Sequence, residues 1–272
     1  MNAVHAKRLL AAATALQFAW ALAIPGIASP PPDPLVEAAG KAAAAYEDSL
    51  PDYIVKRTTT RYRGTRARFD VTIWRPVDTV TGDVTAVHGK EVYSNITING
   101  KPAVELPNRG SWSAGEFTTV LLAILPPERA ATFTHRRNEQ LRNRAAVRYD
   151  FAVDQSHSAW RLAADHLPGS PGHQSYATAY TGAIWIDKQT GQVLRIEMSA
   201  RGLPNWFALN SIESYTDFDF VQIGDRSYLL PERSESLTCE RNGRICLKNE
   251  TVFTNYDKFV SNTSISFDDT AK

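Results

Sequence analysis

Alternating apolar and polar residues dominate the chain from Tyr53 onward. The stretch VLRIEM at 193–198 places Leu194, Ile196 and Met198 on one side of an extended segment and polar residues on the other. Such alternation predicts a strand with one buried face and one wet face. A sheet packed on a core and a sheet wrapped around an apolar cavity both fit this pattern, so both interpretations stay open at this point.

Further stretches rich in Thr, Val, Ile and Tyr are typical of strands. Gly191 and the Asn99–Gly100 pair mark turns between neighbouring strands. Strands are expected at 53–63, 68–74, two within 82–99 that turn near His88–Gly89, 133–137, 145–153, 160–164, 176–186, 193–201, 214–223, 228–239, 244–253 and 264–267.

Helical spacing occurs before the first strand. Asp33 followed by Pro34 is typical of a helix start, with an N-cap carboxylate and proline in the first turn. The helix is expected to run to about Asp48 and to carry Ala39 and Tyr46 on one side.

A second helix interrupts the strands. Ser113 and Glu116 form a capping-box pattern, Phe117 and Leu121 recur at helical spacing, and prolines follow. The spacing predicts an amphipathic helix over 114–125 that buries a strong apolar face.

About a dozen strands with hairpin-length connections and two helices predict an α+β fold. A long meander leaves unpaired edges unless it curls, so we expect a barrel or half-barrel. No linker separates two bodies, and the residues 29–272 are expected to form one domain.

The N-terminus has the three parts of a secretory signal. Lys7 and Arg8 precede an apolar run, and small residues end the run at Ala28. We expect cleavage after Ala28, removal of residues 1–28, and a periplasmic or secreted protein. The alternative is an uncleaved membrane anchor, which Pro25 disfavours because it interrupts the run.

The charge balance argues against a nucleic-acid binder. The chain has 30 Lys and Arg and 29 Asp and Glu, and loss of Lys7 and Arg8 would leave 28 against 29, a net charge of about −1.

Two cysteines occur in the stretch CERNGRIC at 239–246. Asn242–Gly243 is a strong type I′ hairpin signal, and a two-residue turn there places Cys239 opposite Cys246. A disulfide staple worth about 2–3 kcal/mol is expected. A metal site would need further ligands nearby, and a redox pair is more often CxxC.

Catalytic motifs are missing from the sequence: there is no GxSxG, HExxH, phosphate-binding loop or dinucleotide fingerprint. His166 and His173 bracket a loop, but no carboxylate lies between them. A non-enzymatic protein without metal or cofactor is therefore expected.

Two basic stretches surround Arg61 and Arg136. They fit the solvated face of a strand pair, or a docking surface for an acidic partner or anionic head groups.

Large apolar residues are more informative. Aromatic residues on strands mostly belong to cores, yet a concave sheet lined with them would bind a lipid or another apolar ligand. Five tryptophans lie beyond the signal segment: Trp74, Trp112, Trp160, Trp185 and Trp206.

The stretch IWIDKQTGQVLRIEM at 184–198, together with the order of helices and strands, resembles the bacterial lipoprotein-carrier superfamily, the LolA-like periplasmic proteins. The segments 82–102, 112–125 and 224–235 also resemble uncharacterised exported bacterial proteins of that type. The resemblance implies a strongly curved, incompletely closed antiparallel β-barrel of about 11 strands with an N-terminal helix and the inserted helix as a lid over an apolar cavity. This chain is longer than a typical carrier, and its cysteine pair is not part of the carrier pattern.

The resemblance implies an exported binding or carrier protein, monomeric, that holds a lipid, an acyl chain or another apolar ligand. The partner would be an apolar small molecule or a lipidated protein, with transient contact with the envelope membrane or an envelope protein. The alternative is a stress-sensing or scaffold protein that uses the same fold to contact a protein partner. The candidate cavity residues are Trp74, Phe117, Leu121, Trp160, Trp185 and Leu194.

Overall fold

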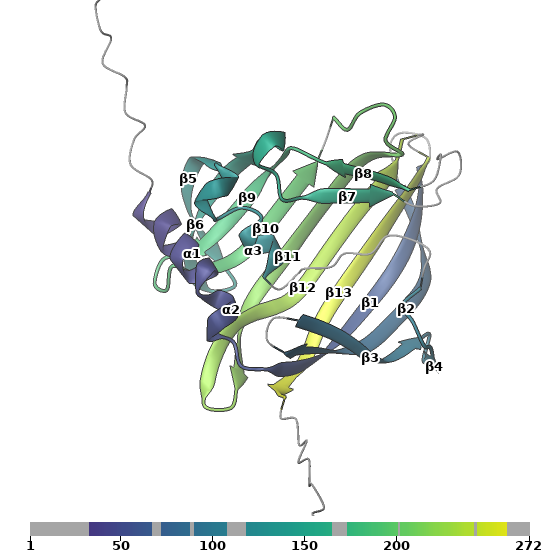
Figure 1. Cartoon of the computed structure of the whole chain (residues 1–272), viewed down its shortest axis with the longest axis horizontal. Helices are drawn as coiled ribbons and strands as arrows, with labels where there is room; N and C mark the ends of the chain where they lie inside the picture. The colour runs from purple at the N-terminus through teal and green to yellow at the C-terminus, as the bar shows by residue number, and fades with distance from the viewer. Residues whose placement is uncertain are drawn as a thin grey trace, which may run out of the picture. The chain divides into compact units, whose positions relative to one another are not determined.

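Eleven antiparallel strands form one large sheet that is strongly curved but not closed, as expected from the sequence (Figure 1). The computed structural model describes residues 33–66, 72–87, 90–107, 118–164, 173–200, 202–241 and 244–259, which belong to one compact unit. The predicted signal segment and the predicted strand at 264–267 lie outside these residues. Among the described residues, no helix is long and apolar enough to cross a membrane.

The strands follow the order β4-β3-β2-β1-β13-β12-β11-β10-β9-β6-β5, so β13, the last strand among the described residues, lies beside β1. A separate two-stranded sheet consists of β7 and β8. The strand bounds are β1 Tyr53–Arg66, β2 Thr72–Val87, β3 Lys90–Ile98, β4 Lys101–Pro102, β5 Thr132–Leu141, β6 Arg144–Val153, β7 Arg161–Ala164, β8 Gln174–Ala177, β9 Tyr180–Asp187, β10 Val193–Ala200, β11 Leu209–Ile223, β12 Arg226–Glu240 and β13 Ile245–Lys258.

Two differences from the sequence prediction concern where one strand ends and another begins. The described part of the strand predicted at 68–74, which is 72–74, and the segment 82–87 belong to one strand, β2, because the residues between them also pair with β1. Pro76 is tolerated there because it lies beside a bulge in the pairing. Conversely, the single strand predicted at 176–186 is split into β8 and β9, since Thr178 donates its backbone N–H to Trp160 O.

The N-terminal helix begins as predicted. The backbone N–H of Leu35 donates to Asp33 Oδ1 at 2.9 Å, and Pro34 occupies the first helical position. Instead of running to Asp48, the helix is divided into α1 (Pro34–Ala44) and α2 (Tyr46–Ser49).

The inserted helix is shorter than predicted. In the described residues, α3 spans Thr119–Leu122 and a 3-10 turn follows at Pro127–Arg129. The helix ends early because the Ile124 backbone N–H bonds to the Leu121 carbonyl, three residues back, just before Pro126. Phe117 and the capping box lie outside the described residues.

The helices lie on the concave side of the sheet (Figure 1). Ala39 and Ala43 of α1 and Leu121 and Ile124 at α3 belong to the same buried apolar cluster as the sheet residues. Two tyrosine hydroxyls join these layers: Tyr46 donates to Leu229 O, and Tyr180 donates to Ala123 O. This part of the concave face is therefore a packed core.

Candidate functional site

The cross-strand pairing assigns each side chain of the hairpin β9–β10 to one face of the sheet. Ile184 lies opposite Ile196, and Trp185 lies opposite Arg195. Opposed residues in an antiparallel pair share a face, and neighbours along a strand alternate between faces. Ile184 and Ile196 are completely buried in the cluster that contains the helices, so they face the concave side. Trp185 and Arg195 consequently face the convex side.

Three of the six predicted cavity residues lie on the concave side. Leu121 and Leu194 are buried in the packed core. Trp160, just before β7, is partly buried and packs edge-to-face on Tyr180, with ring centroids 5.5 Å apart. These three side chains belong to the apolar wall of the concave face.

Trp185 lies on the opposite face. Arginines of the two neighbouring strands lie over its ring, with the guanidinium carbons of Arg148 and Arg195 at 5.2 and 5.7 Å from the ring centroid. The indole Nε1–H donates to Glu139 Oε2 at 2.7 Å. These partners explain how a tryptophan on the wet face is only 8% exposed.

Trp74 also lies on the convex face. It pairs with Gly64 across β1 and β2, and the ring is so close that a Cβ at Gly64 would lie 2.7 Å from it. Lys248 Nζ lies 5.3 Å from the ring centroid of Trp74 and 4.7 Å from that of Tyr62. The structure therefore does not bring Trp74 and Trp185 together with Leu194 in one cavity, and Phe117 lies outside the described residues.

The centre of the concave face is polar. Thr216, Ser234, Thr251 and Thr59 follow one another across β11, β12, β13 and β1 in directly opposed positions, starting next to Ile196. These four side chains are at most 5% exposed. Ile196 fixes the face on which they lie, because opposed residues share a face.

A second polar row runs beside the first. Ser214, Ser236, Asn249 and Arg61 are opposed in the same way across the same four strands. We call the five hydroxyl-bearing residues that are buried in these two rows, Thr59, Thr216, Ser234, Ser236 and Thr251, the hydroxyl belt.

The belt is not saturated with hydrogen bonds. Thr59 and Thr251 bond to each other through their hydroxyl oxygens at 2.9 Å. Ser236 is 7% exposed, and its hydroxyl makes no hydrogen bond within the described part of the chain. A buried hydroxyl without a partner costs about 1–3 kcal/mol, so Ser236 points to a group that the described residues do not supply.

Two arginines lie at the margin of the belt. Arg61 makes a two-pronged ion pair with Asp78, in which Nε donates to Oδ1 at 2.6 Å and Nη2 donates to Oδ2. Arg57 donates to Tyr93 Oη at 2.9 Å and lies over the Phe253 ring. The Asp78 carboxylate therefore neutralises the positive charge of Arg61.

The two basic stretches do not form one surface. Arg61 is buried on β1, an interior strand of the sheet, whereas Arg136 is exposed on β5 at its edge. Arg136 contacts Asp33 Oδ2 at 3.0 Å and the Tyr149 hydroxyl at 3.3 Å. Partial burial alone would raise the pKa of the Asp33 carboxyl. The hydrogen bond from the Leu35 N–H and the contacts with Tyr149 and Arg136 outweigh this effect and lower that pKa.

A hollow of about 630 Å³ lies on the convex face. Its lining includes Asp150, Glu197 and Glu235, which makes it acidic. Burial raises the pKa of Glu235, and the neighbouring Glu250 acts in the same direction. Asp150 is engaged by Arg148 at 2.6 Å, and Glu197 by Arg195 at 3.0 Å. The charged side chains of this hollow thus belong to a network of ion pairs on the convex surface. Within the described residues, no group of three or more metal-ligating side chains comes together.

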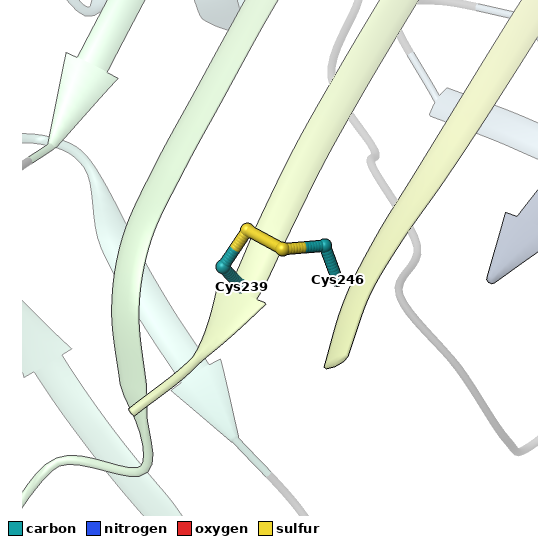
Figure 2. Close-up of a disulfide and its surroundings, with 2 residues drawn as sticks. All are labelled: Cys239 and Cys246. Carbon is teal, nitrogen blue, oxygen red and sulfur yellow. A yellow bond between two sulfur atoms is a disulfide. The ribbon is translucent and has the colours of Figure 1, made fainter. Parts of the chain in front are cut away.

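The predicted disulfide is present. Cys239 on β12 and Cys246 on β13 are directly opposed, with 4.1 Å between their Cα atoms, and they are joined by a disulfide (Figure 2). Both cysteines lie in the row that continues to Gly64 and Trp74, so the staple belongs to the convex side. The turn residues Asn242 and Gly243 lie outside the described residues.

The hydroxyl belt was missed from the sequence because its strands are polar on both faces. The stretch RSESLT at 233–238 alternates charged or apolar residues with hydroxyls, and only the hydroxyls are buried. A segment with polar residues at nearly every position, in the middle of a long meander, is the signal that could have found it.

Comparisons with known proteins add a distant structural likeness. The chain matches no protein family model and no curated protein. It is similar to the crystal structure of a DUF1329 family protein from Desulfovibrio piger, with 10% sequence identity and a TM-score of 0.40 over 84% of this chain and 95% of that chain. A likeness at this level assigns neither a family nor a ligand to the chain.

Proposed function

We propose that this protein is an exported, non-enzymatic binding or carrier protein that holds a lipid, an acyl chain or another ligand with an apolar part on the concave face of its half-barrel. The observation that carries the proposal is the open, strongly curved sheet whose concave face joins an apolar wall to a buried polar strip with an unsatisfied hydroxyl. Such a combination of apolar surface and a few polar groups is typical of small-molecule sites.

The resemblance of 184–198 to LolA-like carriers supports the same function, since those proteins use a half-barrel of this kind. In this proposal the ligand's apolar part packs at the partly buried Trp160, at the margin of the apolar wall to which the buried Leu121 and Leu194 also belong. Trp74 and Trp185, on the convex face, take no part in it.

Export is part of the proposal. The signal-like residues 1–28 and the disulfide between Cys239 and Cys246 both fit an oxidising compartment outside the cytoplasm.

Native mass spectrometry of the protein purified from its own host tests the proposal. We expect a fraction of the protein to carry an extra mass that dissociates on activation, and the delipidated protein to bind the uncharged dye N-phenyl-1-naphthylamine. Repeated absence of bound mass together with no dye binding would contradict a carrier function.

A scaffold function is the second candidate. It is favoured by the exposed, basic edge strand β5, where Arg136 and Arg137 lie about half exposed. Crosslinking in cells separates the two candidates, because a carrier is expected to trap lipids or lipidated proteins and a scaffold to trap one specific protein partner. Charge reversal at Arg137 should abolish only the second kind of product.

A further inference from the structure

The loop at 202–208, between β10 and β11, displays an aromatic side chain to solvent. Trp206 in this loop is 57% exposed, although tryptophan is one of the residues that gain most from burial. Its ring packs edge-to-face on Tyr176 and Phe207, with ring centroids 5.7 Å away in both cases. The ring is therefore held by its neighbours while more than half of the residue's surface stays in water.

The segment around Trp206 carries no charge. The sequence from 202 to 211 contains no acidic or basic side chain. The other large apolar residues of the segment are buried in a small second core that includes β7: Leu203, Phe207 and Leu209. Within 202–208, all of which the structure describes, only Gly202, Asn205 and Trp206 are exposed. Trp206 is thus the large apolar side chain that the loop presents outward.

Arg241, just after β12, binds the backbone of this loop. Its Nε donates to Phe207 O at 2.7 Å. Its Nη2 donates, at 2.8 Å each, to the carbonyl oxygens of Leu203, Pro204 and Leu209. One guanidinium therefore bonds four carbonyl groups on both sides of Trp206.

Two further bonds complete this arrangement. The buried Gln174 of β8 donates from Nε2 to Trp206 O at 3.0 Å, and the backbone N–H of Arg241 donates to Ala208 O at 2.8 Å. The Ala208 N–H in turn donates to Gln174 Oε1 at 2.9 Å. Six of the seven carbonyl groups from 203 to 209 thus have a donor within the protein.

This bonding matters for the medium that the loop can enter. Surface loops ordinarily leave many of their backbone groups to water. In an apolar medium each backbone group without a partner is costly, so a segment can leave water only if its backbone is satisfied internally. The loop 202–208 largely meets this condition and carries no charged side chain that would oppose the transfer.

The size and charge of the exposed surface favour a lipid bilayer over a protein partner. A standard protein interface buries about 800 Å² on each side, far more than Asn205 and Trp206 can offer, whereas single tryptophans are typical of the boundary between membrane and water. The side chain of Arg241 donates here to neutral carbonyls, which leave its positive charge in place beside the loop. A cation at this position attracts anionic head groups.

We propose that the loop 202–208 docks the protein on the surface of a bilayer that contains anionic lipid, with Trp206 as the side chain that enters the interfacial layer and Arg241 as the neighbouring cation. This interaction surface goes beyond the proposed carrier function and does not depend on where a ligand binds.

Co-sedimentation with sucrose-loaded vesicles of POPC containing about 30% POPG tests the proposal. We expect Trp206→Ala to weaken binding to these vesicles about tenfold, because most of the apolar surface that would leave water is lost. Vesicles of POPC alone should bind the natural chain about fivefold more weakly. Val92→Ala is the matched control, since Val92 on β3 is an apolar residue that is 59% exposed, and it should leave binding unchanged.

A second variant keeps the aromatic ring and so preserves the packing on Tyr176 and Phe207. Vesicles of the same composition made with brominated acyl chains quench tryptophan fluorescence at close range. They should quench the natural chain, and this quenching should be lost in Trp206→Phe while the protein still sediments with the vesicles.

The docking proposal is overturned if the natural chain does not sediment with the anionic vesicles, if Trp206→Ala binds them as well as the natural chain, or if Trp206→Phe keeps the quenching. Equal affinity for the two vesicle compositions would overturn the part assigned to Arg241. Binding of N-phenyl-1-naphthylamine without vesicles reports separately on the carrier function. Dye binding without vesicle binding would leave the carrier function standing, and vesicle binding through Trp206 without dye binding would leave only the docking.

Discussion

The wall and the belt are equally buried, yet they stabilise the protein in different ways. Ile124, Ile184 and Ile196 at the wall are completely buried and contribute by removing apolar surface from water. Thr59 and Ser236 in the belt are buried to nearly the same extent but offer hydroxyls, and only the first has a partner. The comparison shows that a low exposed fraction alone does not identify a residue as part of the hydrophobic core. A buried polar group without a partner indicates a place for something else.

The largest expected effect comes from the wall. Ile196→Ala should lower the free energy of unfolding by about 3–4 kcal/mol, because it removes buried methyl groups and leaves a cavity beside Ile184. Urea denaturation followed by fluorescence measures it. Ile73→Ala, at a position that is 55% exposed, is the control and should cost less than about 0.5 kcal/mol. Equal losses at both positions would contradict a packed wall.

The disulfide should contribute the next largest effect. The double variant C239A/C246A is expected to unfold with about 2.5 kcal/mol less free energy, because the crosslink no longer restricts the unfolded chain. Reduction of the natural protein by a thiol should reproduce the loss. An unchanged urea midpoint would show that the hairpin is held by its strands alone.

Asp187 should contribute a smaller effect that depends on pH. Burial opposes its ionisation, but the bond from Arg144 Nε at 2.6 Å and the N–H groups of Gln189 and Thr190 lower the pKa of its carboxyl. A lowered pKa in the folded state gives stability that is present above the ordinary Asp value of about 3.9 and is lost as pH falls through the folded value.

Asp187→Asn should therefore cost about 1–3 kcal/mol at pH 7, and the difference from the natural protein should shrink below about pH 4. Urea denaturation at a series of pH values measures it. If the difference in unfolding free energy between the two proteins stayed constant from pH 7 to pH 2, Asp187 would not be the ionised partner of Arg144.

The smallest change, of opposite sign, is expected in the belt. Ser236→Ala should leave the free energy of unfolding unchanged or raise it by up to about 1 kcal/mol, because it removes a buried hydroxyl that has no partner among the described residues. Differential scanning calorimetry of the ligand-free protein measures it. If the variant lost more than about 1 kcal/mol of unfolding free energy, the Ser236 hydroxyl would have a hydrogen-bond partner within the folded chain, which would contradict this prediction.

The sequence predicts the local features of this fold well. The Asp33 cap, the opposition of Cys239 and Cys246 and the alternation of β10 depend on short-range spacing, and the structure confirms each of them. The number of strands and their short connections also predict an antiparallel sheet that curls, and the incompletely closed form with about 11 strands is what the resemblance to LolA-like carriers implied. The errors at β2 and at β8–β9 arose where a bulge or a single backbone bond decides whether a strand continues.

The candidate site could be predicted only in part. Whether Trp185 shares a face with Leu194 depends on the register of the β9–β10 pairing, which shifts between Val193 and Arg195 and cannot be read from alternation within one strand. To predict the belt, one must know which face of the four polar strands lies on the concave side. The pairing between β1 and β13, which are nearly 200 residues apart in the sequence, determines that face.

The most direct test is a crystal structure of the protein purified from its own host, at a resolution that distinguishes a bound lipid from water. An elongated apolar ligand is expected on the concave face, beside the partly buried Trp160. Water alone on that face, or a ligand bound only on the convex face, would contradict the proposed carrier function.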